Sequence, residues 1–132
     1  MQGLQDFICI DLETTGLNPK RDRIIEIGAV KVRNGQIVET FQQLIDPKQQ
    51  LEERVEILTG ITSKELEGQP AIQEILPKLQ EFLGDEVLLG HIVLFDYSFL
   101  KRTFTNEKIP FERKGDRVSF ETEIDTEYII NL

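Results

Sequence analysis

The sequence has few of the features that mark secreted, membrane-spanning or strongly basic proteins. Among its 132 residues Cys9 is the only cysteine, so no disulfide can form within the chain, and a reducing cytoplasm is the expected compartment. No apolar run approaches the roughly 18 residues of a membrane span, and nothing near the start resembles a signal peptide. Lysine and arginine number 15 against 24 acids, giving a net charge of -9, which excludes nucleic-acid binding by bulk positive charge.

Histidine is equally scarce. His91 is the only one, so a mechanism that needs two histidines from this chain is excluded. An acidic chain can still act on a phosphodiester if clustered carboxylates hold metal cations, because bound cations reverse the local field. The length suits one domain, and 39% hydrophobic with 30% charged residues is ordinary for a folded protein and argues against disorder.

The first third of the chain predicts three antiparallel strands. Residues 7–10 are a short apolar run typical of a central strand, in which the cysteine is a small core residue. Residues 24–32 predict a second strand, although an acid and a glycine interrupt it, and residues 36–45 predict a third. Asn34 and Gly35 between the last two form a strong hairpin signal, so the three strands predict a meander.

Helical patterns dominate the rest of the chain. Thr62 with Glu65 three residues later fits a capping box, and Pro77 inside the longest pattern predicts a bend. Residues 87–89 predict a short buried strand. The predicted helices cover residues 51–58, 71–83, 96–105 and 125–131. The order β-β-β-α-β-α predicts an α/β fold with a mixed sheet.

Two carboxylates, Asp11 and Glu13, stand at the end of the first predicted strand. Residues two apart in a strand point to the same face, so the two carboxylates lie side by side. Like charges at this spacing repel unless a cation lies between them, which indicates a site for a hard divalent metal. The alternative is a pair of acids on a solvent-facing strand end.

A third acid, Asp96, follows the predicted strand at residues 87–89, where a new helix begins. Taken alone, it is equally well explained as the N-cap of that helix, a position that aspartate favours. His91 in the same segment is, taken alone, better explained by a structural hydrogen bond than by a metal.

Together these segments resemble the DEDD 3′–5′ exonucleases. Residues 10–16, Ile-Asp-Leu-Glu-Thr-Thr-Gly, resemble the first exonuclease motif, and residues 90–96, Gly-His-Ile-Val-Leu-Phe-Asp, resemble the second. Residues 58–62, Leu-Thr-Gly-Ile-Thr, are similar to the signature between them. The likeness is greatest to the DEDDh branch, which includes the proofreading epsilon subunit and the exonuclease domains of bacterial DNA polymerase III. It implies a ribonuclease-H-like exonuclease fold, with a mixed sheet that starts with a three-strand antiparallel meander and helices on both faces.

The resemblance also implies roles for single residues. Four acids of that family hold two Mg²⁺ or Mn²⁺ ions, which activate a water and stabilise the leaving oxygen of the terminal phosphodiester. Asp11 would bridge both ions, Glu13 would hold the ion that carries the water, and Asp96 would hold the other. An apolar stacking surface tolerates any base, so trimming needs no sequence readout. The residues expected at the terminal nucleotide are Leu12, Thr14, Leu58, Thr59, His91 and Phe95.

The third motif of the family has no counterpart here. It supplies a general-base histidine and a fourth aspartate, and no histidine follows His91. Ile92 also stands where the family usually has asparagine. Residues 1–132 are therefore expected to be one exonuclease-like domain without its C-terminal part, which binds metal weakly or at one site.

Two functions stay open on this reasoning. The first is a 3′–5′ exonuclease for single-stranded DNA or RNA that is slow or inactive in this chain alone. The second is a degenerate, non-catalytic module that binds nucleic acid or a DNA polymerase. The expected partners are a single-stranded 3′ end and a polymerase, with no membrane, and a homodimer through the C-terminal tail is expected because apolar tail residues could cover an open sheet face.

Overall fold

The computed structural model describes residues 5–90 and 93–111. The elements in this part of the chain are β1 (Phe7–Thr14), β2 (Ile24–Arg33), β3 (Gln36–Leu44), α1 (Glu53–Thr59), α2 (Ser63–Leu66), α3 (Ile72–Leu83), β4 (Leu88–Leu89) and α4 (Val93–Asn106). None of the helices among the described residues is long and apolar enough to cross a membrane. The helix predicted over residues 125–131 and the tail expected at a dimer interface lie outside the described residues.

The sheet is the predicted mixed sheet, with strand order β3-β2-β1-β4. β1 and β2 pair antiparallel, as do β2 and β3, whereas β4 is parallel to β1. Asn34 and Gly35 have φ values of 52° and 74°, the left-handed conformations that a two-residue hairpin turn with right-handed strand twist requires. The predicted α/β class, with a mixed sheet that starts with a three-strand antiparallel meander, is therefore confirmed.

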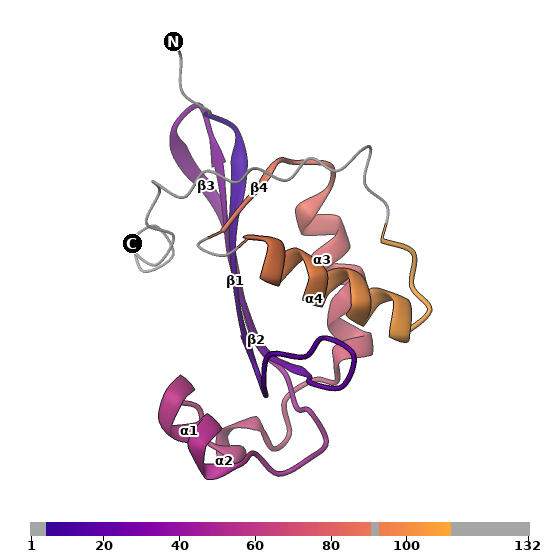
Figure 1. Ribbon diagram of the computed structural model, residues 1–132. Helices are drawn as coiled ribbons and strands as arrows, with labels where there is room; N and C mark the ends of the chain where they lie inside the picture. Colours follow the sequence, from indigo (N-terminus) through magenta and orange to yellow (C-terminus); the bar gives the residue numbers. More distant parts are fainter. Residues whose placement is uncertain (1–4, 91–92, 112–132) are drawn as a thin grey trace.

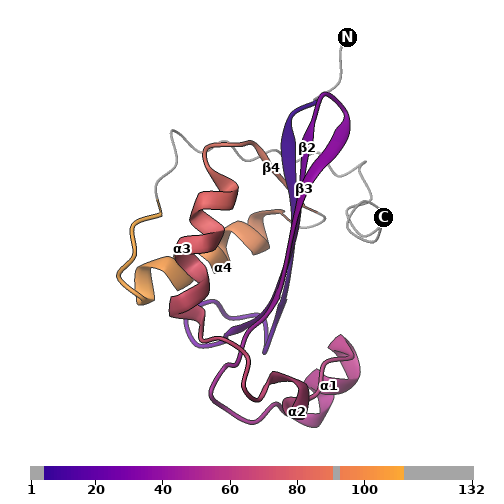
Figure 2. The ribbon, with the colours of Figure 1, turned by 180° about the vertical axis from the view of Figure 1, so that it is seen from behind.

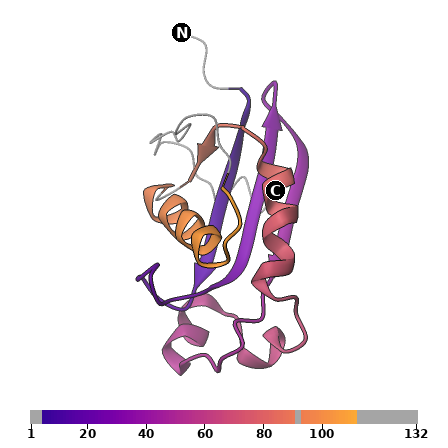
Figure 3. The ribbon, with the colours of Figure 1, turned by 90° about the vertical axis from the view of Figure 1, so that its right-hand side faces the viewer.

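Helices α3 and α4 cover one face of the sheet (Figures 1 and 2). Figure 3, turned by 90°, shows them side by side over the strands. Their buried side chains pack with those of alternate β1 residues into the main core, because successive strand residues point to opposite faces. That core includes Ile8, Ile10, Leu12, Ile27, Leu79, Leu83, Phe99 and Phe104.

The opposite face of the sheet carries a second set of buried side chains. Phe7, Cys9, Val30 and Val32 form a separate cluster there, so the first four residues of β1 are apolar on both faces. Burial raises the pKa of the Cys9 thiol to about 11, which fits its predicted role as a small core residue. Helices α1 and α2 lie at the end of this face, on the side away from α3 and α4 (Figure 1).

The local signals for helices held, with shifts at their ends. Gly60 closes α1 in a left-handed conformation, with φ 74°, and the Thr62–Glu65 capping box forms at α2. Pro77 lies inside α3, and the bend predicted there stays a prediction. Helix α4 begins at Val93, three residues before the predicted start. Asp96 therefore lies in the first turn of α4, and its interpretation as an N-cap is wrong.

Candidate active site

Strand β1 places Asp11 and Glu13 on the face of the sheet opposite α3 and α4. Its first four residues are fully or almost fully buried, whereas both acids are half-buried. In the pairing with β2, Asp11 lies opposite Gly28 and Glu13 lies opposite Glu26. Directly opposite residues of an antiparallel pair share a face, so Glu26 adds a third carboxylate to the same surface.

Asp96 joins the acid pair because β4 is short. β4 pairs with Ile8 and Cys9, and no strand among residues 5–90 and 93–111 pairs with this edge of β1 further along. The N–H of Leu12 points to that edge, as does that of Ile8, which donates to the carbonyl of Val87 at 2.8 Å. The Asp96 carboxylate accepts the Leu12 N–H. Leu12 lies between Asp11 and Glu13 in β1, so Asp96 of α4 lies at the end of β1.

The electrostatics of Asp96 report the same arrangement. The residue is only 5% exposed. Burial raises the pKa of its carboxyl to about 8, with further increases from the charges of Asp11 and then Glu13, and the Leu12 hydrogen bond acts in the opposite direction. Asp96 is distant in sequence from Asp11 and Glu13, yet the charges of these two acids raise its pKa.

This shift predicts how stability depends on pH when no cation is bound. In the unfolded chain Asp96 loses its proton near pH 4, whereas in the folded chain it keeps the proton up to about pH 8. The folded state binds more protons in this window, so we expect the free energy of unfolding to fall as pH rises through it. For Asp96→Asn, which retains an acceptor for the Leu12 N–H, the free energy of unfolding should fall less over the same range. Urea unfolding of the wild type and of this variant across the range measures the difference. An equal decrease in the two proteins would contradict the raised pKa of Asp96.

A β-bulge redirects the chain directly after the acids. The pairing register shifts between Glu13 and Thr14, a feature that bends a strand and often adjoins active sites. The Thr15 hydroxyl accepts from the N–H of Arg23 at 2.9 Å and donates to Oδ1 of Asp22 at 3.1 Å. Oδ2 of Asp22 accepts from the N–H of Asn18 at 2.9 Å, so one carboxylate holds the two ends of the loop between β1 and β2.

Gly16 is required by this closure. A Cβ at this position would lie 2.4 Å from Oδ2 of Asp22, inside the distance of any real contact. The Thr14 hydroxyl donates to the carbonyl of Gly16 at 2.6 Å, which fixes the turn out of β1. The glycine of the first motif thus has a packing reason, namely the close approach of the Asp22 carboxylate.

The residues expected at the terminal nucleotide differ in how accessible their side chains are. Leu12 is buried in the main core, so only its backbone can meet a nucleotide, and Phe95 packs against Phe99 with ring centroids 5.0 Å apart. The Thr59 hydroxyl donates to the carbonyl of Val55 at 2.8 Å within α1. Leu58 is 86% exposed on α1 and is available for stacking. His91 lies outside the described residues.

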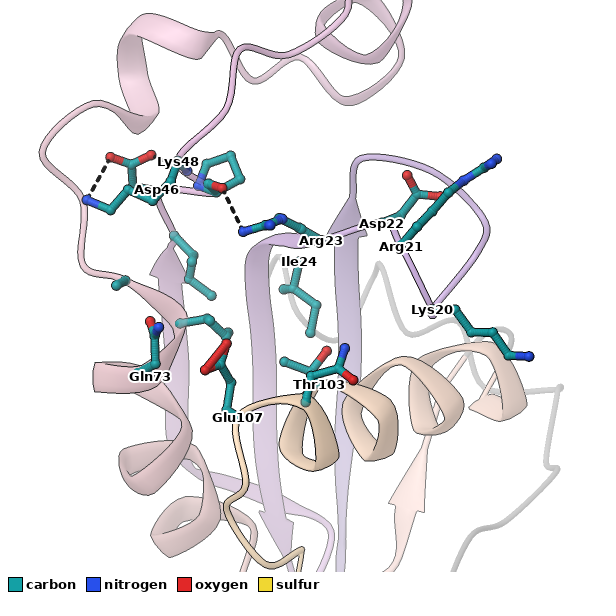
Figure 4. A pocket seen from close by; sticks show the side chains of 15 residues that line it. Lys20, Arg21, Asp22, Arg23, Ile24, Asp46, Lys48, Gln73, Thr103 and Glu107 are labelled. Atoms are coloured by element: carbon teal, nitrogen blue, oxygen red, sulfur yellow. Dashed lines mark hydrogen bonds and ion pairs between the residues drawn. The ribbon is translucent and has the colours of Figure 1, made fainter.

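One cavity with a charged lining, on the helix-covered face, is separate from the acids. A cavity of about 230 Å³ lies between β2, the end of β3, α3 and α4 (Figure 4), and neither Asp11, Glu13 nor Asp96 lines it. Its Lys48 pairs with Asp46 at 3.5 Å, and Arg23 donates to the carbonyl of Pro47 at 3.2 Å. These contacts engage Lys48 and Arg23, and the cavity does not reach the three acids, so it is not assigned to the site.

Comparison with known proteins identifies the family of this chain. A sequence profile described as Exonuclease, of the RNase T type, matches residues 8–129. The chain belongs to this exonuclease family. A DNA polymerase III of the PolC type from Clostridium perfringens is 45% identical over 97 residues, which are 74% of this chain and 7% of that protein. The DNA polymerase III subunit epsilon of Aquifex aeolicus is 43% identical over 96 residues, 73% of this chain and 48% of that protein.

Solved structures show the same fold of the exonuclease family. Exonuclease I without ligand superposes with a TM-score of 0.74 at 18% identity, over 89% of this chain and 28% of that chain. E. coli exonuclease I in complex with a dT13 oligonucleotide gives 0.70 at 19% identity, over 80% and 25%. The chain therefore spans less than half of the relatives that it matches, and these likenesses support the fold alone.

The acids of this family member have the donor chemistry for a divalent cation. Oxygen ligands from Asp11, Glu13 and Asp96 suit Mg²⁺ or Mn²⁺. Within residues 5–90 and 93–111, however, no three histidine, cysteine, aspartate or glutamate side chains are already placed to hold a metal ion.

Three further residues near the site are not predicted from the sequence. Leu17, 84% exposed at the loop after β1, and Ile57, 76% exposed on α1, add apolar surface near Leu58 and Thr14 in sequence. Glu26 was noticed only as an acid that interrupts an apolar strand. An acid inside a buried strand was the available signal, and its register opposite Glu13 shows why it matters.

Proposed function

We propose that this exonuclease-family chain carries the cation-binding acids of a 3′–5′ exonuclease that removes terminal nucleotides from single-stranded nucleic acid. One observation carries the proposal. Asp96 of α4 accepts the N–H of Leu12, so its carboxylate stands beside Asp11 and Glu13 although the sequence separates them widely. Family membership suggests the class of reaction, and the three acids suggest where in the fold the cation binds.

The chain's own residues have distinct tasks in this proposal. Asp11, Glu13 and Asp96 hold a divalent cation, which when bound activates water and stabilises the leaving oxygen. Leu58, with its exposed apolar side chain, offers the terminal base a stacking surface that does not depend on the base. The loop closed by Asp22 fixes the backbone after Glu13, where the terminal sugar is expected.

Single-stranded DNA is the substrate that the comparisons favour. One exonuclease I structure contains a dT13 oligonucleotide, and several relatives are named as DNA polymerase III proteins. By the same likeness we propose a DNA polymerase as the partner in which such a domain acts. Mg²⁺ and Mn²⁺ are both candidates for the cation, because both prefer oxygen ligands.

We expect slow hydrolysis by the 132-residue chain alone. A positioned general base contributes about 10²- to 10⁴-fold, and His91 is the only histidine available. Mn²⁺ should bind weakly, because the proposal has three carboxylate ligands and affinity for hard cations depends on ligand charge and number. Isothermal calorimetry with Mn²⁺ should show heat for the wild type and much less for Asp11→Ala, and equal heats would refute the site.

A non-catalytic binding module is the second candidate. The lack of a ready-made set of three metal ligands among residues 5–90 and 93–111 favours it. The two candidates differ in one assay, the shortening of a 5′-labelled single strand with Mn²⁺. If the wild type shortens the strand from its 3′ end and Asp11→Asn does not, the exonuclease is supported. If the chain binds the strand without shortening it, the module is supported.

A further inference from the structure

The outer side of α4 carries a hollow with an unusual lining. Its volume is about 320 Å³, and every lining residue is cationic, hydroxyl-bearing or proline. The residues are Pro19, Lys20, Ser98, Lys101, Arg102 and Thr105. We refer to these six as the α4 groove. None of them is an acid, although the chain as a whole has a net charge of -9.

Helical geometry aligns four of these side chains. Ser98, Lys101, Arg102 and Thr105 follow one another at intervals of three, one and three, which places them on one stripe of α4. All four are exposed. The stripe extends for about 10 Å along the helix, which is longer than one nucleotide. Pro19 and Lys20 come from the loop after β1, and Figure 4 shows the Lys20 side chain extending alongside α4.

The cations of the α4 groove are not neutralised locally. Among residues 5–90 and 93–111, no ion pair involves Lys20, Lys101 or Arg102. The cavity of Figure 4 shares Lys20 with the α4 groove, but its Lys48 is paired with Asp46. Three cations and the Ser98 hydroxyl, without an acid, form a donor set that proteins use for phosphate oxygens. The Thr105 hydroxyl already donates to the carbonyl of Lys101 at 2.9 Å.

The α4 groove is also connected to the acids by both of its elements. Helix α4 begins at the acid site, with Asp96 in its first turn, and continues through Lys101 and Thr105. The loop leaves β1 directly after Glu13 and reaches Lys20. A strand whose terminal phosphodiester lies at the acids can therefore continue along α4.

We propose that the α4 groove binds the phosphodiester backbone of the single strand upstream of its terminal nucleotide. The proposal rests on the proposed function, because the acids define where the strand ends. Phosphates of the strand would accept hydrogen bonds from Lys20, Lys101 and Arg102, and Ser98 would add a hydroxyl donor. These contacts position the strand without reading its sequence.

The test is the salt dependence of binding, with EDTA present so that no cleavage occurs. Anisotropy of a fluorescein-labelled oligothymidylate gives the dissociation constant of the full chain at several salt concentrations. Each phosphate contact contributes about -0.7 to the slope of log K against log salt. The double variant Lys101→Gln, Arg102→Gln should bind more weakly, with a slope shallower by about 1.4. The matched control Lys64→Gln, Lys78→Gln removes the same charge from α2 and α3 and should keep the wild-type slope.

Three outcomes would contradict binding of the strand by the α4 groove. The first is an unchanged salt slope in Lys101→Gln, Arg102→Gln, and the second is an equal loss of affinity in both double variants. The third is displacement of the strand by oligoglutamate at equal charge. The last would identify an acidic protein segment as the occupant. Thermal unfolding should be the same for all variants, because the substituted side chains are exposed.

Failure of the proposed function is distinguishable. If the chain binds with the predicted slope but releases no nucleotide with Mn²⁺, the exonuclease proposal fails and the α4 groove stands as a nucleic-acid site. If it releases nucleotides and the slope does not depend on Lys101 and Arg102, the exonuclease proposal stands and the α4 groove fails.

Discussion

Replacing Asp11 by asparagine should lower the rate of nucleotide release with Mn²⁺ by about 100-fold or more. Loss of a residue that only orients a metal ligand typically costs about 10- to 100-fold, so loss of a ligand should cost at least the upper part of that range. Glu13→Gln should act in the same direction, since the charge of Glu13 also raises the pKa of Asp96. Release of mononucleotides under single-turnover conditions measures both.

The matched control for these substitutions is Glu53→Gln on α1. Glu53 is exposed in the first turn of that helix, so the change removes one charge away from the three acids. Its rate should equal that of the wild type. If Asp11→Asn and Glu53→Gln slow the reaction equally, the acids at the end of β1 are not the site.

Replacing Phe99 by alanine should lower the free energy of unfolding by about 3–5 kcal/mol. The side chain is fully buried in the main core, and its ring packs against Phe95. A small domain has a total stability of only about 5–15 kcal/mol, so this variant should unfold at much lower urea. Urea unfolding followed by circular dichroism gives the shift.

Leu58→Ala is the comparison for this core substitution. The Leu58 side chain is 86% exposed, so the change should alter stability by no more than about 0.5 kcal/mol. If it also raises KM for the single strand without changing stability, the proposed stacking role gains support. A loss of stability as large as that of Phe99→Ala would contradict the placement of Leu58 on the surface.

The sequence predicted the elements whose causes are local. Asn34 and Gly35 suit a turn with positive φ, and the alternation around Asp11 and Glu13 gives their common face in β1. The capping box at Thr62 and the closure of α1 by Gly60 are equally local. Each depends on neighbours within a few residues, which is why composition and spacing were sufficient.

Features that depend on distant contacts were missed or misplaced. Helix α4 begins earlier than its polar signal suggested, because Asp96 hydrogen bonds with β1 instead of capping its own helix. The contact of Asp22 with the turn at Gly16 closes a loop, and only its three-dimensional path reveals it. The α4 groove combines Lys20 with a helix far away in sequence, so spacing could not predict it.

The central claim is that Asp11, Glu13 and Asp96 form one cation site in this chain. Anomalous scattering from crystals of the chain grown with Mn²⁺ tests it most directly, because it places the ion without reference to activity. The account predicts Mn²⁺ between Asp11 and Asp96, beside the Leu12 backbone, and no such peak in Asp11→Ala. Mn²⁺ bound only at other acids, such as Asp46, would contradict the account.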